Sequence, residues 1–284
     1  MIPAEFSYVR PTSVGEAVEA LSTADEAKVL AGGHSLLPLM KLRLAYPETL
    51  VDVSRIDALH GVREDGDRLV VGAATTHHDL TGDPLIGRHC GVLATVTSTI
   101  GDPSVRHRGT HGGALAHGDA ASDLPAVALA LDARFVAEGP GGRRTIDAAD
   151  FFVDYLETAL AADEVLVEVS WPRLPASATW NYQKFNRVAQ AWATVGALAV
   201  VDRANGTIDH ARIGLTHMGL VPVRPVAVEQ ALAGVATDDA GAVRAAADQA
   251  AEGTSPPDDA NASADFRRHL ARVLTRRAVQ AALT

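Results

Sequence analysis

The first part of the chain alternates short apolar runs with amphipathic stretches, which is typical of alternating strands and helices. Residues 12–21 carry apolar side chains at helical spacing after a Ser or Thr N-cap. An apolar run at 28–31, a helical stripe at 35–44 and a second apolar run at 50–53 predict a strand, a helix and a strand. This order predicts a compact, right-handed crossover unit.

A second segment begins at about residue 56. Three apolar runs in it predict strands, at 68–73, 134–137 and 164–169. A glycine-rich turn is expected at 139–142. Asp83 followed by Pro84 predicts the start of a single long helix, with Asp83 as its N-cap. After a polar, glycine-rich passage, Ser122 or Asp123 is expected to cap a short helix.

The pattern changes after Trp171. Three more strands are predicted, at 182–185, 194–202 and 211–217. Asn205-Gly206 predicts a tight hairpin between the last two. Ala-rich stretches then predict helices at 225–234, 238–251 and 263–282. Strands followed by helices indicate a separate α+β unit. We therefore expect one domain at 1–172, with subdomains at about 1–55 and 56–172, and a second domain at 173–284.

Composition excludes several classes of protein. The 284 residues include 25 basic and 35 acidic side chains, a formal net charge of −10, which argues against nucleic acid as a partner. A single cysteine, Cys90, allows neither an internal disulfide nor an iron–sulfur cluster held by this chain alone. No apolar run approaches the roughly 20 residues that span a bilayer. Glu5 and Arg10 lie where a secretory signal needs apolar residues, so we expect a cytoplasmic protein.

Gly32-Gly33 lies where a predicted strand meets a predicted helix. Unpaired N–H groups at such a junction can bind an anion, and glycine lets a phosphate approach the backbone closely. His34 and Ser35 could add donors. Any strand-to-helix turn can use glycine for its φ angle alone, and this pair by itself favours that interpretation. The spacing matches neither the dinucleotide-binding G-x-G-x-x-G fingerprint nor a Walker loop.

A second glycine pair, Gly112-Gly113, lies in the segment RHRGTHGGA at 106–114. Two arginines and three glycines surround the hydroxyl of Thr110, a combination that suits a pyrophosphate. For one loop, a solvated surface turn is an equally fair interpretation. Two such loops in one chain favour a large diphosphate cofactor held between them.

The histidines between residues 77 and 117 suggest a metal, but their spacing is irregular and no H-E-x-x-H motif occurs. We expect no metal site and treat these histidines as surface and loop residues. Asp119 and Asp123 are four residues apart, and a helix cap is the simpler interpretation of Asp123. No paired acid and base or nucleophile motif is evident, so we expect no catalytic residue acting on a substrate.

Several longer motifs complete the pattern. They are F-x-Y-x-R-P at 6–11, AGGHSLLPLMKLRLA at 31–45, LVDVSRI at 50–56, IGDPSVRHRGTHGGALAHGDAASDLPA at 100–126, TALAADEVLVEVSWP at 158–172, YQKFNR at 182–187, GLTHMG at 214–219 and FRRHLARVLTRRAV at 266–279. Together they resemble the FAD-binding medium subunits of the molybdenum hydroxylases, a family that includes carbon monoxide dehydrogenase and xanthine dehydrogenase. The resemblance implies an α+β fold: a two-subdomain α/β FAD-binding domain followed by a C-terminal antiparallel sheet with a helical bundle.

The resemblance also implies a set of FAD-binding residues. They are Ala31, Gly32, Gly33, His34, Ser35, Ile100, Thr110, His111, Gly112, Gly113, Ala114, Asp123, Leu166, Lys184 and Trp192. The two glycine turns would hold the pyrophosphate, Asp123 would lie near the adenosine half, and Lys184 and Trp192 would lie beside the flavin ring. The chain departs from the family where His111 replaces the more usual Ile and Ala114 replaces Ser or Asn.

The implied function is that of an oxidoreductase subunit. A molybdenum-binding large subunit would pass electrons to an iron–sulfur small subunit. This chain would take them from the small subunit and pass them through FAD to NAD, a quinone or oxygen. Two other classes stay open: a stand-alone flavin-dependent oxidase or dehydrogenase, and a non-catalytic protein that has lost its cofactor. Turnover of an organic substrate by the purified chain alone would favour the first of these, and a flat visible spectrum after incubation with FAD the second.

Overall fold

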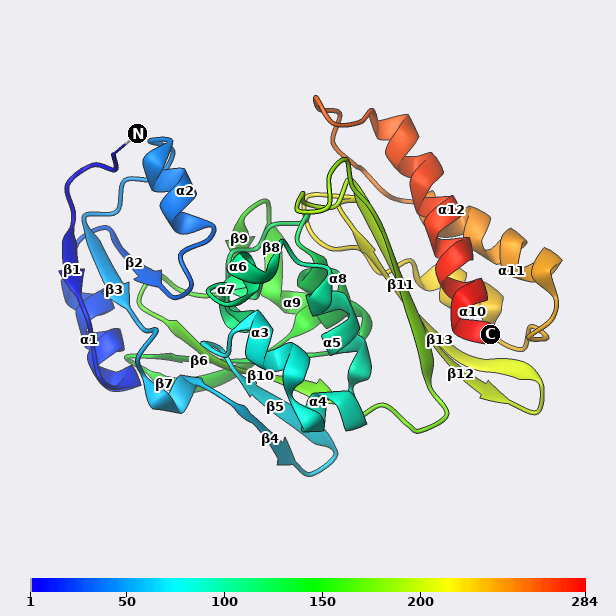
Figure 1. Ribbon diagram of the computed structural model, residues 1–284, viewed down its shortest axis with the longest axis horizontal. Helices are drawn as coiled ribbons and strands as arrows, with labels where there is room; N and C mark the ends of the chain where they lie inside the picture. Colours follow the sequence, from blue (N-terminus) through cyan, green and yellow to red (C-terminus); the bar gives the residue numbers. More distant parts are fainter. Residues whose placement is uncertain (1) are drawn as a thin grey trace.

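The computed structural model describes residues 2–284, in which three units follow one another along the long axis of the molecule (Figure 1). The N-terminal unit is a parallel three-stranded sheet of order β1-β3-β2, with helix α1 packed against it. Its elements are β1 (Ser7–Val9), α1 (Val14–Thr23), β2 (Ala27–Leu30), α2 (Leu36–Lys41) and β3 (Thr49–Asp52). The predicted strand–helix–strand unit is confirmed. Strand β1 was not predicted, because its three residues are all exposed and carry no buried stripe.

The central unit is an antiparallel sheet of order β4-β5-β10-β6-β7. Its strands are β4 (Val62–Asp65), β5 (Arg68–Gly72), β6 (Arg134–Gly139), β7 (Gly142–Asp147) and β10 (Val165–Pro172). The strands predicted from apolar runs are β5, β6 and β10, the three that lie inside the sheet. The edge strands β4 and β7 are mostly exposed, and the sequence analysis missed them. The turn predicted at 139–142 joins β6 to β7.

Short helices and a small hairpin surround this sheet (Figure 1). They are η1 (Asp57–Leu59), α3 (His77–Gly82), α4 (Pro84–His89), α5 (Gly91–Ser98), α6 (Pro103–Arg106), α7 (His111–Ala116), α8 (Asp123–Ala130), α9 (Ala148–Phe151), β8 (Phe152–Asp154) and β9 (Glu157–Thr158). Asp83 caps α4 as predicted, but the single long helix is wrong. The chain leaves helical geometry at Cys90 (φ −152°, ψ 51°), and a Cβ on Gly91 would lie 2.7 Å from the Trp180 ring.

The C-terminal unit is an antiparallel sheet of order β11-β12-β13, covered on its outer face by helices (Figure 1). Its elements are β11 (Thr179–Phe185), β12 (Val195–Ala204), β13 (Thr207–Thr216), α10 (Val226–Leu232), α11 (Ala240–Ala247), η2 (Asp248–Ala251) and α12 (Ala264–Leu283). The predicted hairpin is confirmed, with Asn205 and Gly206 at φ 52° and 79°. The α+β fold class is therefore confirmed. Within residues 2–284, no helix has the length and apolar character needed to cross a membrane.

Strand β12 joins two hydrophobic cores. Alternate side chains of a strand point to opposite faces. On β12, Val195 and Ala197 pack with the C-terminal helices, whereas Leu198 and Val200 pack in the core of the central unit. This double burial explains the continuous apolar run that identified the strand in the sequence. The division of the chain at residue 172 stays a prediction.

Candidate functional site

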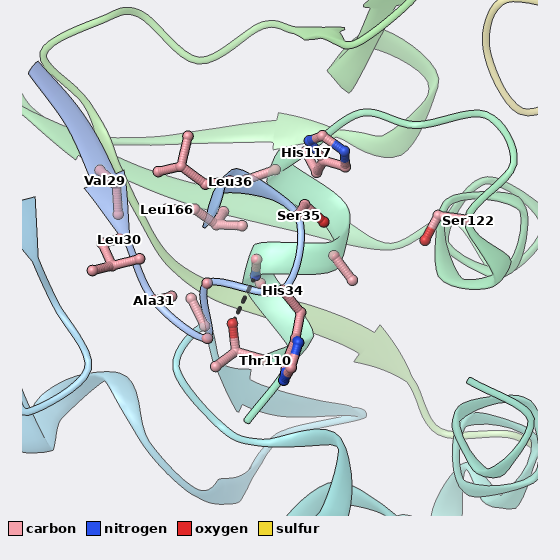
Figure 2. A pocket seen from close by; sticks show the side chains of 18 of the residues that line it. Val29, Leu30, Ala31, His34, Ser35, Leu36, Thr110, His117, Ser122 and Leu166 are labelled. Carbon is pink, nitrogen blue, oxygen red and sulfur yellow. Dashed lines mark hydrogen bonds between the residues drawn. The ribbon is translucent and has the colours of Figure 1, made fainter. Parts of the chain in front are cut away.

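A cavity of about 710 Å³ lies where the three units meet. Its lining includes every FAD-binding residue implied by the resemblance except His111. Figure 2 shows the turn that carries Ala31, His34 and Ser35 beside the short helix that begins after Thr110. The chain thus brings together residues from positions 31 to 192 around one space large enough for a dinucleotide.

The first glycine turn presents unpaired backbone donors. It follows β2 and leads into α2, and Gly33 has φ +75°, a conformation that other residues adopt only with strain. Within residues 2–284, the N–H groups of residues 32–35 donate to no protein acceptor. Successive free N–H groups in a turn form a concavity that binds anions. This turn therefore has the chemistry of a phosphate site.

The amides of the second glycine turn are already used. The N–H groups of His111 and Gly112 donate to the carbonyls of Thr75 and Ala73, both at 2.8 Å. Gly113 donates to the Thr110 hydroxyl at 3.1 Å, the bond drawn in Figure 2. Gly112 is required by packing, because a Cβ there would lie 2.4 Å from the Ala73 Cβ. The second turn thus shapes the cavity wall, while the first supplies the free donors.

The two arginines expected near the pyrophosphate do not line the cavity. Arg106 donates to the Ile100 carbonyl at 2.9 Å, and Arg108 is exposed. Lys28 and Lys184 are the cations among the lining residues. The attraction for an anion at the turn therefore comes mainly from backbone N–H groups.

His111 lies in the core behind the second turn. It is fully buried, and its Nε2 accepts a 3.2 Å hydrogen bond from the Trp171 indole. Its Nδ1 has no partner, and burial lowers the pKa of His111 to about 3. His77 lines the cavity, and burial together with nearby Arg106 lowers its pKa to about 4. The expectation that these histidines lie in surface loops is therefore wrong for both.

Asp123 is part of a buried network and does not cap its helix. Ser122 occupies the N-cap position of α8, and Asp123 is the first helical residue. The Asp123 carboxylate accepts from Lys184 Nζ at 2.8 Å and from the Tyr182 hydroxyl at 2.6 Å. Burial raises the pKa of Asp123, and Lys184 and Tyr182 partly offset this rise.

This ion pair bears on the expected roles of its members, which stay predictions. Asp123 was expected near the adenosine half of FAD and Lys184 beside the flavin ring. The two side chains are in contact, so they form one feature of the cavity wall and not two separate ones. Sequence reasoning missed this contact, since 61 residues separate the partners and neither strand nor helix pattern predicts it.

The sequence analysis also missed part of the lining. His77 and the β8–β9 hairpin residues 156–158 contribute to the cavity. Trp192, which was expected beside the flavin ring, is half-exposed and lines the cavity. Ile100 and Leu166 give the cavity an apolar wall. The hairpin strands are too short to show a period of two, so no sequence signal marked them. Within residues 2–284, no cluster of three or more His, Cys, Asp or Glu is placed to hold a metal ion.

Comparison with known proteins gives the family. The family model described as "FAD binding domain in molybdopterin dehydrogenase" matches residues 4–174, and "CO dehydrogenase flavoprotein C-terminal domain" matches residues 180–282. The carbon monoxide dehydrogenase medium chain of Hydrogenophaga pseudoflava is 43% identical, with 99% of this chain and 98% of that protein aligned. The nicotine 6-hydroxylase medium subunit of Paenarthrobacter nicotinovorans is 36% identical, with 96% and 95% aligned.

Solved structures agree over the same length. Carbon monoxide dehydrogenase from Hydrogenophaga pseudoflava superposes with a TM-score of 0.96 at 45% identity, covering 99% of this chain and 98% of that chain. Quinoline 2-oxidoreductase from Pseudomonas putida 86 superposes with a TM-score of 0.95 at 34% identity, covering 100% and 98%. The chain therefore belongs to the family of FAD-binding medium subunits of molybdenum-containing hydroxylases.

Proposed function

We propose that this chain holds one FAD in the cavity and passes electrons from an iron–sulfur subunit to an external acceptor. The iron–sulfur subunit would receive these electrons from a molybdenum-binding large subunit. The assembly would work in the cytoplasm. FAD, when bound, accepts electrons and returns them to an acceptor such as NAD, a quinone or oxygen. The chain's own residues bind the cofactor, orient it and exclude water from one side.

The observation that carries the proposal is the row of free N–H groups at residues 32–35. A pyrophosphate needs several donors at once, and these N–H groups belong to residues that line the cavity. The left-handed Gly33 keeps this turn open toward the cavity, and the Ile100 and Leu166 side chains offer apolar surface to a ring system. The residues present therefore fit a dinucleotide such as FAD.

The need for partners follows from what this chain lacks. One cysteine cannot ligate an iron–sulfur cluster, which takes about four thiolates. The relatives described above are themselves named as a medium chain and a medium subunit. Nothing in the comparisons favours the stand-alone oxidase that the sequence left open. Native co-purification, with metal analysis of the complex and identification of the bound chains, tests the partners. Isolation of a chain that turns over an organic substrate alone would contradict them.

The binding mode is tested with a matched pair of glycines. Gly33→Ala places a side chain at φ +75° in the turn, whereas Gly61→Ala places one at φ +91° where no atom lies within 4 Å. Each variant places a side chain at positive φ, a strain of about 1–2 kcal/mol, and the Gly33→Ala methyl group also meets the Leu37 side chain at 2.8 Å. We expect Gly33→Ala to lower FAD affinity by about tenfold or more and Gly61→Ala to leave it unchanged.

A harsher test uses the wall of the second turn. Gly113→Val would press against the Thr110 hydroxyl, which lies 2.6 Å from the position of a Cβ at residue 113. We expect the purified Gly33→Val and Gly113→Val proteins to be colourless. Yellow colour retained by both, with flavin absorption at one FAD per chain, would contradict the proposed site.

A further inference from the structure

Tyr182 lies behind the cavity wall, and its hydroxyl contacts the Asp123–Lys184 ion pair. Tyr182 does not line the cavity, but its hydroxyl donates to Asp123 Oδ1 at 2.6 Å. Lys184 Nζ donates to the other oxygen, Oδ2, at 2.8 Å. The side chains of Lys184 and Asp123 are only 8% and 5% exposed, so water does little to screen this pair.

The fold makes room for the Tyr182 hydroxyl. A Cβ on Gly196, in the neighbouring strand β12, would lie 2.4 Å from this oxygen, so glycine at 196 is what allows the ring to reach Asp123. Thr216 Oγ1 lies 3.4 Å away on β13. The Tyr182 ring also packs against the central core. Its hydroxyl is therefore held in one place by three elements.

Lys184 has one N–H group to spare. An ammonium carries three donors, of which one goes to Asp123 and one to the Thr99 carbonyl at 3.2 Å. Lys184 lines the cavity, so the third donor is available to a ligand there. The Tyr182 hydroxyl holds Asp123 Oδ1 and so fixes the orientation in which the other oxygen, Oδ2, faces Lys184. Without the tyrosine hydroxyl, the carboxylate could rotate, and the ammonium could follow it and turn away from the cavity.

We propose that Tyr182 is a positioning residue, which keeps the spare N–H of Lys184 directed into the cavity and thereby favours the reduced form of the bound flavin. The inference rests on the proposed function, since it requires FAD with its ring at the Asp123–Lys184 end of the cavity. Reduction adds negative charge to the ring, and a buried cation beside it stabilises the reduced state. The neutral adenine would gain no comparable benefit from such a charge.

The test compares variants of the FAD-loaded protein that keep the core intact. Tyr182→Phe removes one oxygen, Lys184→Met removes the charge and Lys184→Arg restores it. Tyr46→Phe is the matched control, because Tyr46 is exposed. In an anaerobic titration against a reference dye, the ratio of reduced to oxidised flavin is measured at one fixed dye potential. FAD content per chain and the urea midpoint are recorded for each protein.

We expect Tyr182→Phe to lower this ratio by about fivefold and Lys184→Met by about tenfold or more. Lys184→Arg and Tyr46→Phe should stay close to the unmodified protein. An unchanged ratio in Tyr182→Phe at full FAD content would overturn the inference. If Tyr182→Phe loses FAD, Gly196→Ala decides, since its Cβ would lie 2.4 Å from the Tyr182 oxygen and displace the hydroxyl from Asp123. That variant should also lower the ratio, and an unchanged ratio overturns the inference. An unmodified chain that binds no FAD would instead refute the proposed function.

Discussion

Gly32 packs directly against the backbone of Arg108: a Cβ on Gly32 would lie 2.1 Å from the Arg108 carbonyl oxygen. The turn after β2 thus touches the segment that leads into the second glycine turn, although 76 positions separate the two residues. This contact closes the cavity between the N-terminal and central units, and it holds the free N–H groups of residues 32–35 in place.

Gly32→Ala should therefore separate the two turns. The added methyl group meets rigid backbone, and such overpacking lowers the free energy of unfolding by about 1–3 kcal/mol. We expect FAD binding to be lost with it. Gly15→Ala is the matched control, because Gly15 lies in α1 with no atom within 4 Å of its Cβ position. That control should gain about 0.5–1 kcal/mol. Urea unfolding and FAD titration measure both, and equal behaviour of the two variants would refute the packing argument.

His111 should make the protein sensitive to acid. Its pKa is about 3 in the folded chain and about 6.5 in the unfolded one. Below pH 6.5 the unfolded chain takes up the proton first, so stability falls as pH falls from about 6.5 toward 3. At pH 5 the loss from this residue is about 2 kcal/mol. His111→Ile should remove that part of the difference between the free energies of unfolding at pH 7.5 and pH 5.

The slope with pH is the informative quantity in this experiment. His111→Ile also leaves the Trp171 indole without its acceptor, which costs about 1–3 kcal/mol at every pH. His77, with a pKa of about 4, keeps part of the acid sensitivity. His210→Gln, at an exposed position of β13, serves as the control and should leave the slope unchanged. A His111→Ile protein as acid-sensitive as the unmodified chain would show that this burial does not govern stability.

Gly214 positions the helix that carries Asp123. A Cβ on Gly214, in β13, would lie 2.5 Å from the Ala126 carbonyl oxygen of α8. Gly214→Ala should push α8 away from the sheet, lower stability by about 1–3 kcal/mol and weaken FAD binding. Gly219→Ala is the control, since its nearest neighbours are at ordinary contact distances of 3.4 Å or more. Unchanged FAD affinity in a destabilised Gly214→Ala protein would mean that α8 does not position the cofactor.

Local signals in the sequence predicted the elements that local chemistry decides. Ser13 and Asp83 cap helices through their own side chains, and Asn205-Gly206 adopts the positive φ angles that its hairpin needs. The two glycine turns were located for the same reason. Strands inside a sheet were found because both of their faces are apolar, whereas the exposed strands β1, β4 and β7 carry no such pattern.

Contacts between distant residues account for what could not be predicted. The Trp180 ring lies beside Gly91 at the break between α4 and α5, and the Trp171 indole donates to the buried His111. The different roles of the two glycine turns follow from which carbonyls lie opposite their amides. The carbonyls of Thr75 and Ala73 accept hydrogen bonds from amides of the second turn. Among residues 2–284, no backbone carbonyl accepts from the amides of the first turn. Spacing along the chain contains no information on such partners.

Hydrogen exchange of the individual backbone amides, with and without FAD, tests the central claim most directly. We predict that the amides of residues 32–35 exchange fast in the cofactor-free protein and become protected when FAD binds. Those of His111, Gly112, Gly113 and Ala114 should already be slow and change little, because their hydrogen bonds lie within the protein. Fast exchange at residues 32–35 in the fully loaded protein would contradict the claim that this turn holds the pyrophosphate.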